Sequence, residues 1–185
     1  MIYKLIFAKM NLCSIMKNFT LVVFVLTVSS LVGFSQSTEE LEKRKGFKDL
    51  KVYTEVNEYD FLNLDKEVKG DIPNVAIYKP TKGKYTSIGA IKIHDMEIIT
   101  YRDYIHEIII TTEKEPNLFK GLQKAFGKGK YDWRSDKFYW SATSLNLTFQ
   151  SIAKAKTQLV YHSKEIDELI KTDKKSKVTD LVSEF

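Results

Sequence analysis

The chain has 185 residues, with 29 basic and 24 acidic side chains and a formal net charge of +5. Residues 1–35 contain three lysines and no acidic residue, so the remaining 150 residues carry a net charge of only +2. This balance is ordinary for one soluble domain and lacks the concentrated basic face that nucleic-acid binding requires. We therefore expect no nucleic-acid partner.

The first 35 residues have the pattern of a secretory signal peptide. Lys17 precedes an apolar stretch over residues 19–34, and small residues lead up to a predicted cleavage site between Ser35 and Gln36. The stretch is shorter than the roughly 20 apolar residues of a spanning helix, so a cleaved signal is favoured over an uncleaved anchor. Met16 is an alternative start. We expect an exported protein, periplasmic or extracellular, that meets the membrane only through this segment before cleavage.

Cys13 is the only cysteine of the chain, and it lies before the apolar stretch. A chain cleaved after Ser35 would hold no thiol, which excludes a disulfide or a cysteine-ligated metal within it. A domain of this length buries an adequate core without disulfides. The lack of cysteine in an exported chain favours a bacterial source.

The mature chain is expected to open on a polar leader, residues 36–46. Beyond it, Thr54 is placed to cap a helix that carries Val56 and Tyr59 on one side. Gly70 begins a turn sequence that ends this helix.

Alternation with a period of two begins near residue 74 and predicts strands. Three of them follow almost without a break, over residues 85–93, 96–102 and 105–112. Two-residue turns at 94–95 and 103–104 connect them as an antiparallel meander. In that register Lys92 pairs with Glu97 across two strands.

The segment between Pro116 and Gly127 has the clearest helical pattern. Pro116 suits the first position of a helix and Gly127 the position just past its end. The apolar residues between them form one stripe: Leu118, Phe119, Leu122, Ala125 and Phe126. A polar loop over residues 127–137 follows, then three strand-like runs, and Ser163 is placed to cap a short helix.

This order of elements predicts an α+β fold over residues 47–171. We expect an antiparallel meander sheet of about six to seven strands, with two to three helices packed on one face. Leu145, Leu147 and Phe149 alternate with polar residues, so at least one strand has a buried face and a wet face.

Asp103, His106 and Glu107 are the candidate catalytic residues, because general-base chemistry needs imidazole and carboxylate groups within reach of one atom. Simple strand alternation places His106 opposite Tyr101 and turns Glu107 to the other face. The favoured interpretation is therefore a structural histidine stacked on Tyr101. The sequence has no motif for a serine nucleophile, a phosphate loop or a dinucleotide site. We expect no metal site and no cofactor.

The segment 131–140 is rich in aromatic residues and holds both tryptophans of the chain. Exposed rings beside charged groups suit a sugar-stacking or protein-recognition surface. The candidate binding residues are Tyr131, Trp133, Arg134, Tyr139 and Trp140. The competing interpretation, favoured for Trp140 and its neighbour Phe138, is that these rings fill the core beneath the preceding helix.

Residues 172–185 are expected to form a lysine-rich linker and a short tail that is amphipathic or disordered. Its apolar residues fall at helical spacing: Val178, Leu181, Val182 and Phe185. Eight residues do not hold a helix alone in water, so the tail docks on its own domain, docks on a partner or frays. Fraying is the favoured interpretation.

The sequence leaves three functions open. The favoured one is an exported non-catalytic domain that binds an unidentified protein or another cell-envelope component. The second is a carrier of a small ligand or glycan, with a pocket lined by Tyr139, Trp140, Asn146, Thr148 and Gln150. The third is a hydrolase that uses the three candidate catalytic residues.

Overall fold

The structure is a computed structural model, and it describes residues 36–70 and 72–183. The predicted signal peptide with Ser35, and Phe185 at the other end, lie outside the described residues. Among the helices of the described part, none combines the length and the apolar character needed to cross a membrane.

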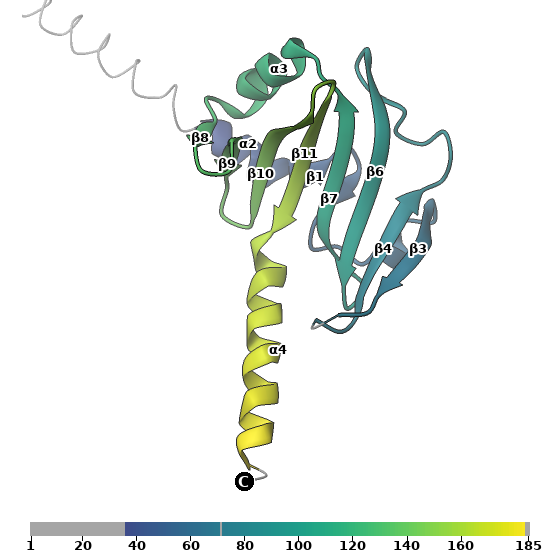
Figure 1. Ribbon diagram of the computed structural model, residues 1–185, viewed down its shortest axis with the longest axis vertical. Helices are drawn as coiled ribbons and strands as arrows, with labels where there is room; N and C mark the ends of the chain where they lie inside the picture. Colours follow the sequence, from purple (N-terminus) through teal and green to yellow (C-terminus); the bar gives the residue numbers. More distant parts are fainter. Residues whose placement is uncertain (1–35, 71, 184–185) are drawn as a thin grey trace, which may run out of the picture. The chain divides into compact units, whose positions relative to one another are not determined.

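The fold is built on an open antiparallel sheet of nine strands (Figure 1). The first half contains β3 (Leu62–Val68), β4 (Val75–Pro80), β5 (Ser87–Ile88), β6 (Ile91–Tyr101) and β7 (Tyr104–Glu113). The second half contains β8 (Lys130–Asp132), β9 (Lys137–Ser141), β10 (Leu145–Ala153) and β11 (Lys156–Ser163). The order across the sheet is β3-β4-β6-β7-β11-β10-β9-β8, and β5 pairs with β6. Two meanders therefore meet where β7 pairs with β11.

The two outer strands of the described sheet differ from the central ones. β3 is exposed over most of its length, and its register with β4 shifts so that Asp65 is an extra, bulged residue. β8, at the other edge, is three residues long. The central strands β7 and β11 instead alternate between buried and half-buried residues.

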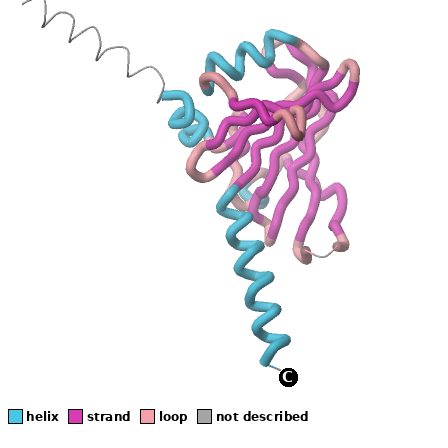
Figure 2. The backbone as a smooth tube through the Cα atoms, turned by 60° about the vertical axis from the view of Figure 1, so that its left-hand side comes forward, coloured by secondary structure: helices cyan, strands magenta, loops and turns pink. Residues whose placement is uncertain are grey.

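One face of the sheet carries the core. It is covered by α2 (Gln36–Arg44), the hairpin of β1 (Gly46–Phe47) and β2 (Leu50–Lys51), and α3 (Pro116–Phe126). α4 (Lys164–Ser183) continues from β11 and extends beyond the end of the sheet (Figures 1 and 2). The expected α+β class with an antiparallel sheet is confirmed, and the sheet is larger than the expected six to seven strands.

The segment expected to be a polar leader forms α2 and the start of β1. Leu41 is completely buried in the core. The carboxylate of Glu42 accepts hydrogen bonds from the backbone N–H and the hydroxyl of Ser144, at 2.9 and 2.6 Å. The packed domain therefore begins before residue 47.

The helix expected after Thr54 is reduced to one 3-10 turn, Val56–Glu58. The backbone here pairs with the start of β7 instead: Tyr53 N–H donates to the Ile105 carbonyl at 2.8 Å. Long-range pairing of this kind overrides a local helical pattern.

The predicted turn at residues 94–95 is wrong. β6 runs through both residues, and a register shift against β7 makes His94 the extra residue of a bulge. The chain reverses at Gly89, which has φ of +61°, and Lys92 pairs with Ser87 rather than with Glu97. The second turn lies one residue earlier than expected, at Arg102 and Asp103. Both of these residues have positive φ, as a type I′ hairpin turn requires.

The helix predicted between Pro116 and Gly127 is confirmed as α3. Glu115 caps it by accepting a hydrogen bond from Asn117 N–H at 3.2 Å, and Gly127 ends it with φ of +76°. The three strands predicted after it are also present, preceded by β8 inside the expected loop.

The cap expected at Ser163 is present, because its hydroxyl accepts a hydrogen bond from Ile166 N–H at 3.3 Å. The helix that it starts, α4, continues through the expected lysine-rich linker to Ser183. The backbone of Val178, Leu181 and Val182 is therefore helical, while their side chains lie outside the described part.

Candidate functional site

A β-bulge in β7 brings a histidine and a glutamate onto one face of the sheet. Ile105 pairs with Thr100 and Glu107 with Ile99, so His106 is the extra residue on β7. Ile105 is fully buried, whereas His106 and Glu107 are both half-buried. A bulge of this kind redirects side chains that alternation would place on opposite faces. Both side chains consequently point away from the core.

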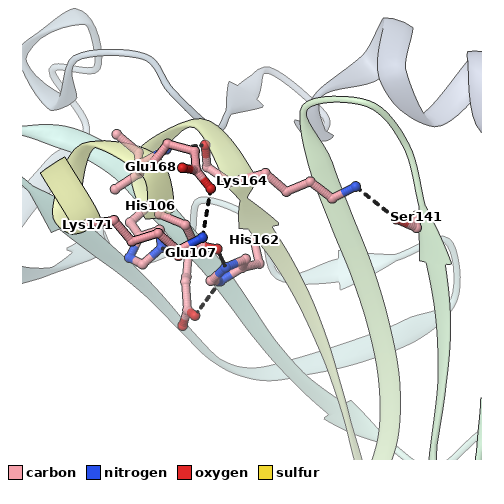
Figure 3. Close-up of polar contacts among 10 residues, drawn as sticks. His106, Glu107, Ser141, His162, Lys164, Glu168 and Lys171 are labelled. Carbon is pink, nitrogen blue, oxygen red and sulfur yellow. Dashed lines mark hydrogen bonds and ion pairs between the residues drawn. The ribbon is translucent and has the colours of Figure 1, made fainter.

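Two further residues complete a compact cluster on this face. His162 of β11 is the cross-strand partner of Glu107, and its Nδ1 lies 2.7 Å from Glu107 Oε1 (Figure 3). Asp167, in the first turn of α4, lies between the two histidines. Its Oδ1 is 3.1 Å from His106 Nε2, and its Oδ2 is 2.7 Å from His162 Nε2. The ring beside His106 is that of His162, with centroids 4.7 Å apart, rather than the expected Tyr101.

The charges of this cluster are tightly linked. The hydrogen bond to Glu107, helped by Asp167, raises the pKa of His162 to about 9 despite partial burial. Burial and the neighbouring charge of His162 lower the pKa of His106. Burial alone would raise the pKa of Asp167, but its bonds to the two histidines outweigh that effect and lower it. Without another ligand, these interactions therefore favour the protonated form of His162.

The structure separates one of the three residues predicted to act together. His106 and Glu107 join the cluster, whereas Asp103 lies exposed in the β6–β7 turn. The carboxylate beside His106 belongs to Asp167. Neither Asp167 nor His162 was among the predicted site residues. Their only local signal is a histidine at the end of a strand and an aspartate in the first turn of the following helix.

The first half of α4 is held against the sheet by several polar contacts. Tyr101 donates its hydroxyl hydrogen to Asp173, and Arg102 Nη2 lies 2.8 Å from Asp173 Oδ2. Lys164 donates to the Ser141 hydroxyl at 2.9 Å (Figure 3). These contacts fix the part of α4 that carries Asp167.

The β8–β9 hairpin forms a second surface of interest. Trp133, in its turn, is 74% exposed, and Tyr131, on β8 beside the turn, is 53% exposed. The guanidinium carbon of Arg134 lies 5.3 Å from the centroid of the Trp133 ring. Asp132 holds the turn, because it accepts hydrogen bonds from Arg134 N–H at 3.0 Å and from the Ser135 hydroxyl at 2.5 Å.

The remaining aromatic candidates do not share this exposure. Trp140 is 3% exposed, and its indole N–H donates to the Gly127 carbonyl at 2.8 Å. Phe138 packs on Phe119 of α3, with centroids 4.4 Å apart. Tyr139 is half-buried. Trp140 thus belongs to the core, as the competing interpretation held.

A pocket of about 410 Å³ lies beside the hairpin, between α3 and the sheet. Phe119, Phe138 and Phe149 give it an apolar lining, with Asp136 and Glu115 among its polar groups. Of the residues expected to line a carrier pocket, Gln150 lines this one.

No protein-family model matches the chain, and neither a curated protein nor a solved structure matches it.

Proposed function

We propose that this protein is an exported, non-catalytic domain that binds a macromolecular component of the cell envelope through the tip of the β8–β9 hairpin. The observation that carries the proposal is a tryptophan, 74% exposed, on a turn fixed by side-chain hydrogen bonds. An exposed tryptophan gives up the free energy that burial of its large apolar ring would contribute. On an ordered turn, such a side chain is typical of a recognition surface, because tryptophan is enriched in the hot spots of interfaces.

The hairpin tip has the composition of a binding hot spot. Tryptophan, tyrosine and arginine dominate the energetics of protein interfaces, and aromatic rings also stack on sugars. Tyr131 is tethered as well, since its hydroxyl donates to Asp136 Oδ1 at 2.7 Å. A tip that is ordered before binding loses little conformational entropy when a partner docks.

The surface next to the tip supports the same proposal. Asp136 and Phe138 belong to the hairpin region and also line the 410 Å³ pocket. A partner seated on Trp133 would therefore find an apolar hollow with acidic groups beside it.

The test is retention of the purified protein by isolated cell envelopes of the source organism. An anchor tryptophan contributes about 2 kcal/mol or more, so Trp133→Ala should weaken binding by roughly 30-fold. The matched control is Ile152→Ala, which removes another exposed apolar side chain, 45% exposed, from the end of β10. That variant should bind like the unaltered protein.

Pretreating the envelopes identifies the class of partner. Loss of binding after protease treatment indicates a protein, and loss after peptidoglycan hydrolysis indicates a glycan. Equal retention of the unaltered protein and of Trp133→Ala, or no retention of either, would reject the proposal.

A further inference from the structure

The cluster on β7, β11 and α4 has the donor set of a transition-metal site. His106, His162 and Asp167 each offer one ligand atom, and these atoms all lie within 4.8 Å of one another. Two imidazoles with one carboxylate suit Zn²⁺ and similar ions, whereas Ca²⁺ and Mg²⁺ take oxygen ligands. We propose that these three residues bind one divalent transition-metal ion of the Zn²⁺ class.

The present distances are close to those that a bound ion needs. In a tetrahedral site with bonds of about 2.0–2.1 Å, neighbouring ligand atoms lie about 3.3–3.4 Å apart. Asp167 is now 3.1 Å from His106 Nε2 and 2.7 Å from His162 Nε2. An increase of about 0.2–0.7 Å in the separation of Asp167 from each imidazole nitrogen would bring these two distances to that spacing.

Glu107 has the position of an outer partner that orients a metal ligand. It accepts a hydrogen bond from His162 Nδ1 at 2.7 Å, which directs Nε2 of the same ring toward Asp167 and His106. Carboxylate–histidine–metal arrangements use this contact to fix the tautomer and the ring orientation of the ligand. The bulge at His106 is what allows a ligand and this orienting residue to follow each other in sequence on one face.

The elements that carry the ligands are well fixed. β7 and β11 are adjacent central strands, and the Ser163 cap places Asp167 one turn into α4. Ligands held by strands and a helix are positioned more accurately than ligands held by loops. Three protein ligands leave a fourth position for water or for a group from a bound molecule. A metal here would also tie α4 to the sheet.

The test uses the full chain, expressed without a polyhistidine tag and stripped of metal with a chelator. Titration with Zn²⁺ and Co²⁺ should show one ion per chain, and Co²⁺ should give the strong visible absorption of four-coordinate cobalt. Mg²⁺ and Ca²⁺ should not compete. X-ray absorption of the zinc-loaded protein should show nitrogen and oxygen ligands, with two imidazoles.

Variants separate this site from adventitious binding. His106→Gln and His162→Gln should each abolish stoichiometric binding, and Glu107→Gln should weaken it about 10- to 100-fold while keeping one ion per chain. The matched control is His94→Gln, since His94 is the third histidine of the chain and lies exposed on β6. It should bind metal normally.

Absence of stoichiometric binding would overturn the proposal, as would equal loss in His94→Gln. The X-ray absorption measurement needs no variant, so it decides the question even if a ligand substitution prevents folding. A spectrum with fewer than two imidazoles would refute the assignment.

Discussion

The burial of Leu41 predicts that α2 is part of the folding unit. Replacing Leu41 by Ala removes three carbon groups from a fully buried site, which costs about 2.4 kcal/mol in transfer free energy. Incomplete collapse of the space left behind raises the total to about 3–4 kcal/mol. For a domain of this size, the melting temperature should fall by about 6–16 °C.

Thermal unfolding followed by circular dichroism measures this loss. Alanine is a better helix former than leucine, so the substitution tests packing and not helix propensity. The control is Lys43→Ala on the same helix, whose side chain is exposed and whose loss should change stability by less than about 0.5 kcal/mol. If Leu41→Ala melts within about 2 °C of the unaltered protein, α2 does not belong to the cooperative unit and the reasoning fails.

Two further predictions concern a hydrogen-bonded carboxylate and the packing around glycine. Burial raises the pKa of Glu42, but the hydrogen bonds from Ser144 outweigh it and hold the pKa below its usual value of 4.5. The stability that this lowered pKa contributes is present above pH 4.5 and is lost as the pH falls through the folded value. Glu42→Gln should therefore be less stable at pH 7 by about 1 kcal/mol in urea unfolding, and the difference should vanish in acid; a difference that persists there would contradict the assignment. Gly129→Ala would place a Cβ 2.8 Å from the Trp140 ring and should cost about 1–3 kcal/mol. Gly121→Ala, in α3 with open space around it, should stabilise the protein by up to about 1 kcal/mol, and similar behaviour of the two glycine variants would refute the packing argument.

The parts of the fold that local signals specify were predictable. α3 has a proline at its first position, a glycine just past its end and an apolar stripe between them, and each feature acts within a few residues. Apolar and polar residues alternate in the strands after it, so the sequence indicates which side chains face the core.

The wrong predictions concern segments whose structure is decided by pairing between residues far apart in the sequence. The turn expected at residues 94–95 relied on two polar residues, yet pairing with β7 carries β6 straight through them. Gly89, two residues before β6, was the better turn signal, because positive φ is inexpensive for glycine.

His106 and Glu107 were candidates from the sequence, but their assembly with His162 and Asp167 was not predictable, because it too depends on distant pairing. A bulge at His106 depends on the register of β6 and β7, which no local pattern records. His162 and Asp167 lie more than fifty residues further along the chain. The pairing of β7 with β11 places His162 opposite Glu107, and Asp167 contacts the two histidines. The exposed hairpin tip was easier to find, since tryptophan in a charged turn is uncommon.

The open edges of the sheet have a consequence for how the molecule behaves in a crowded compartment. Unpaired N–H and C=O groups on an outer strand can template the strand of a second molecule and start aggregation. At one edge, β3 exposes the charged residues Asp65, Lys66 and Glu67, and its bulge interrupts the regular ladder. At the other edge, β8 offers only three residues for pairing. The charges and the bulge of β3 oppose pairing with another molecule at one edge, and the shortness of β8 limits it at the other. Both edges can therefore remain unpaired with little risk of polymerisation through added strands.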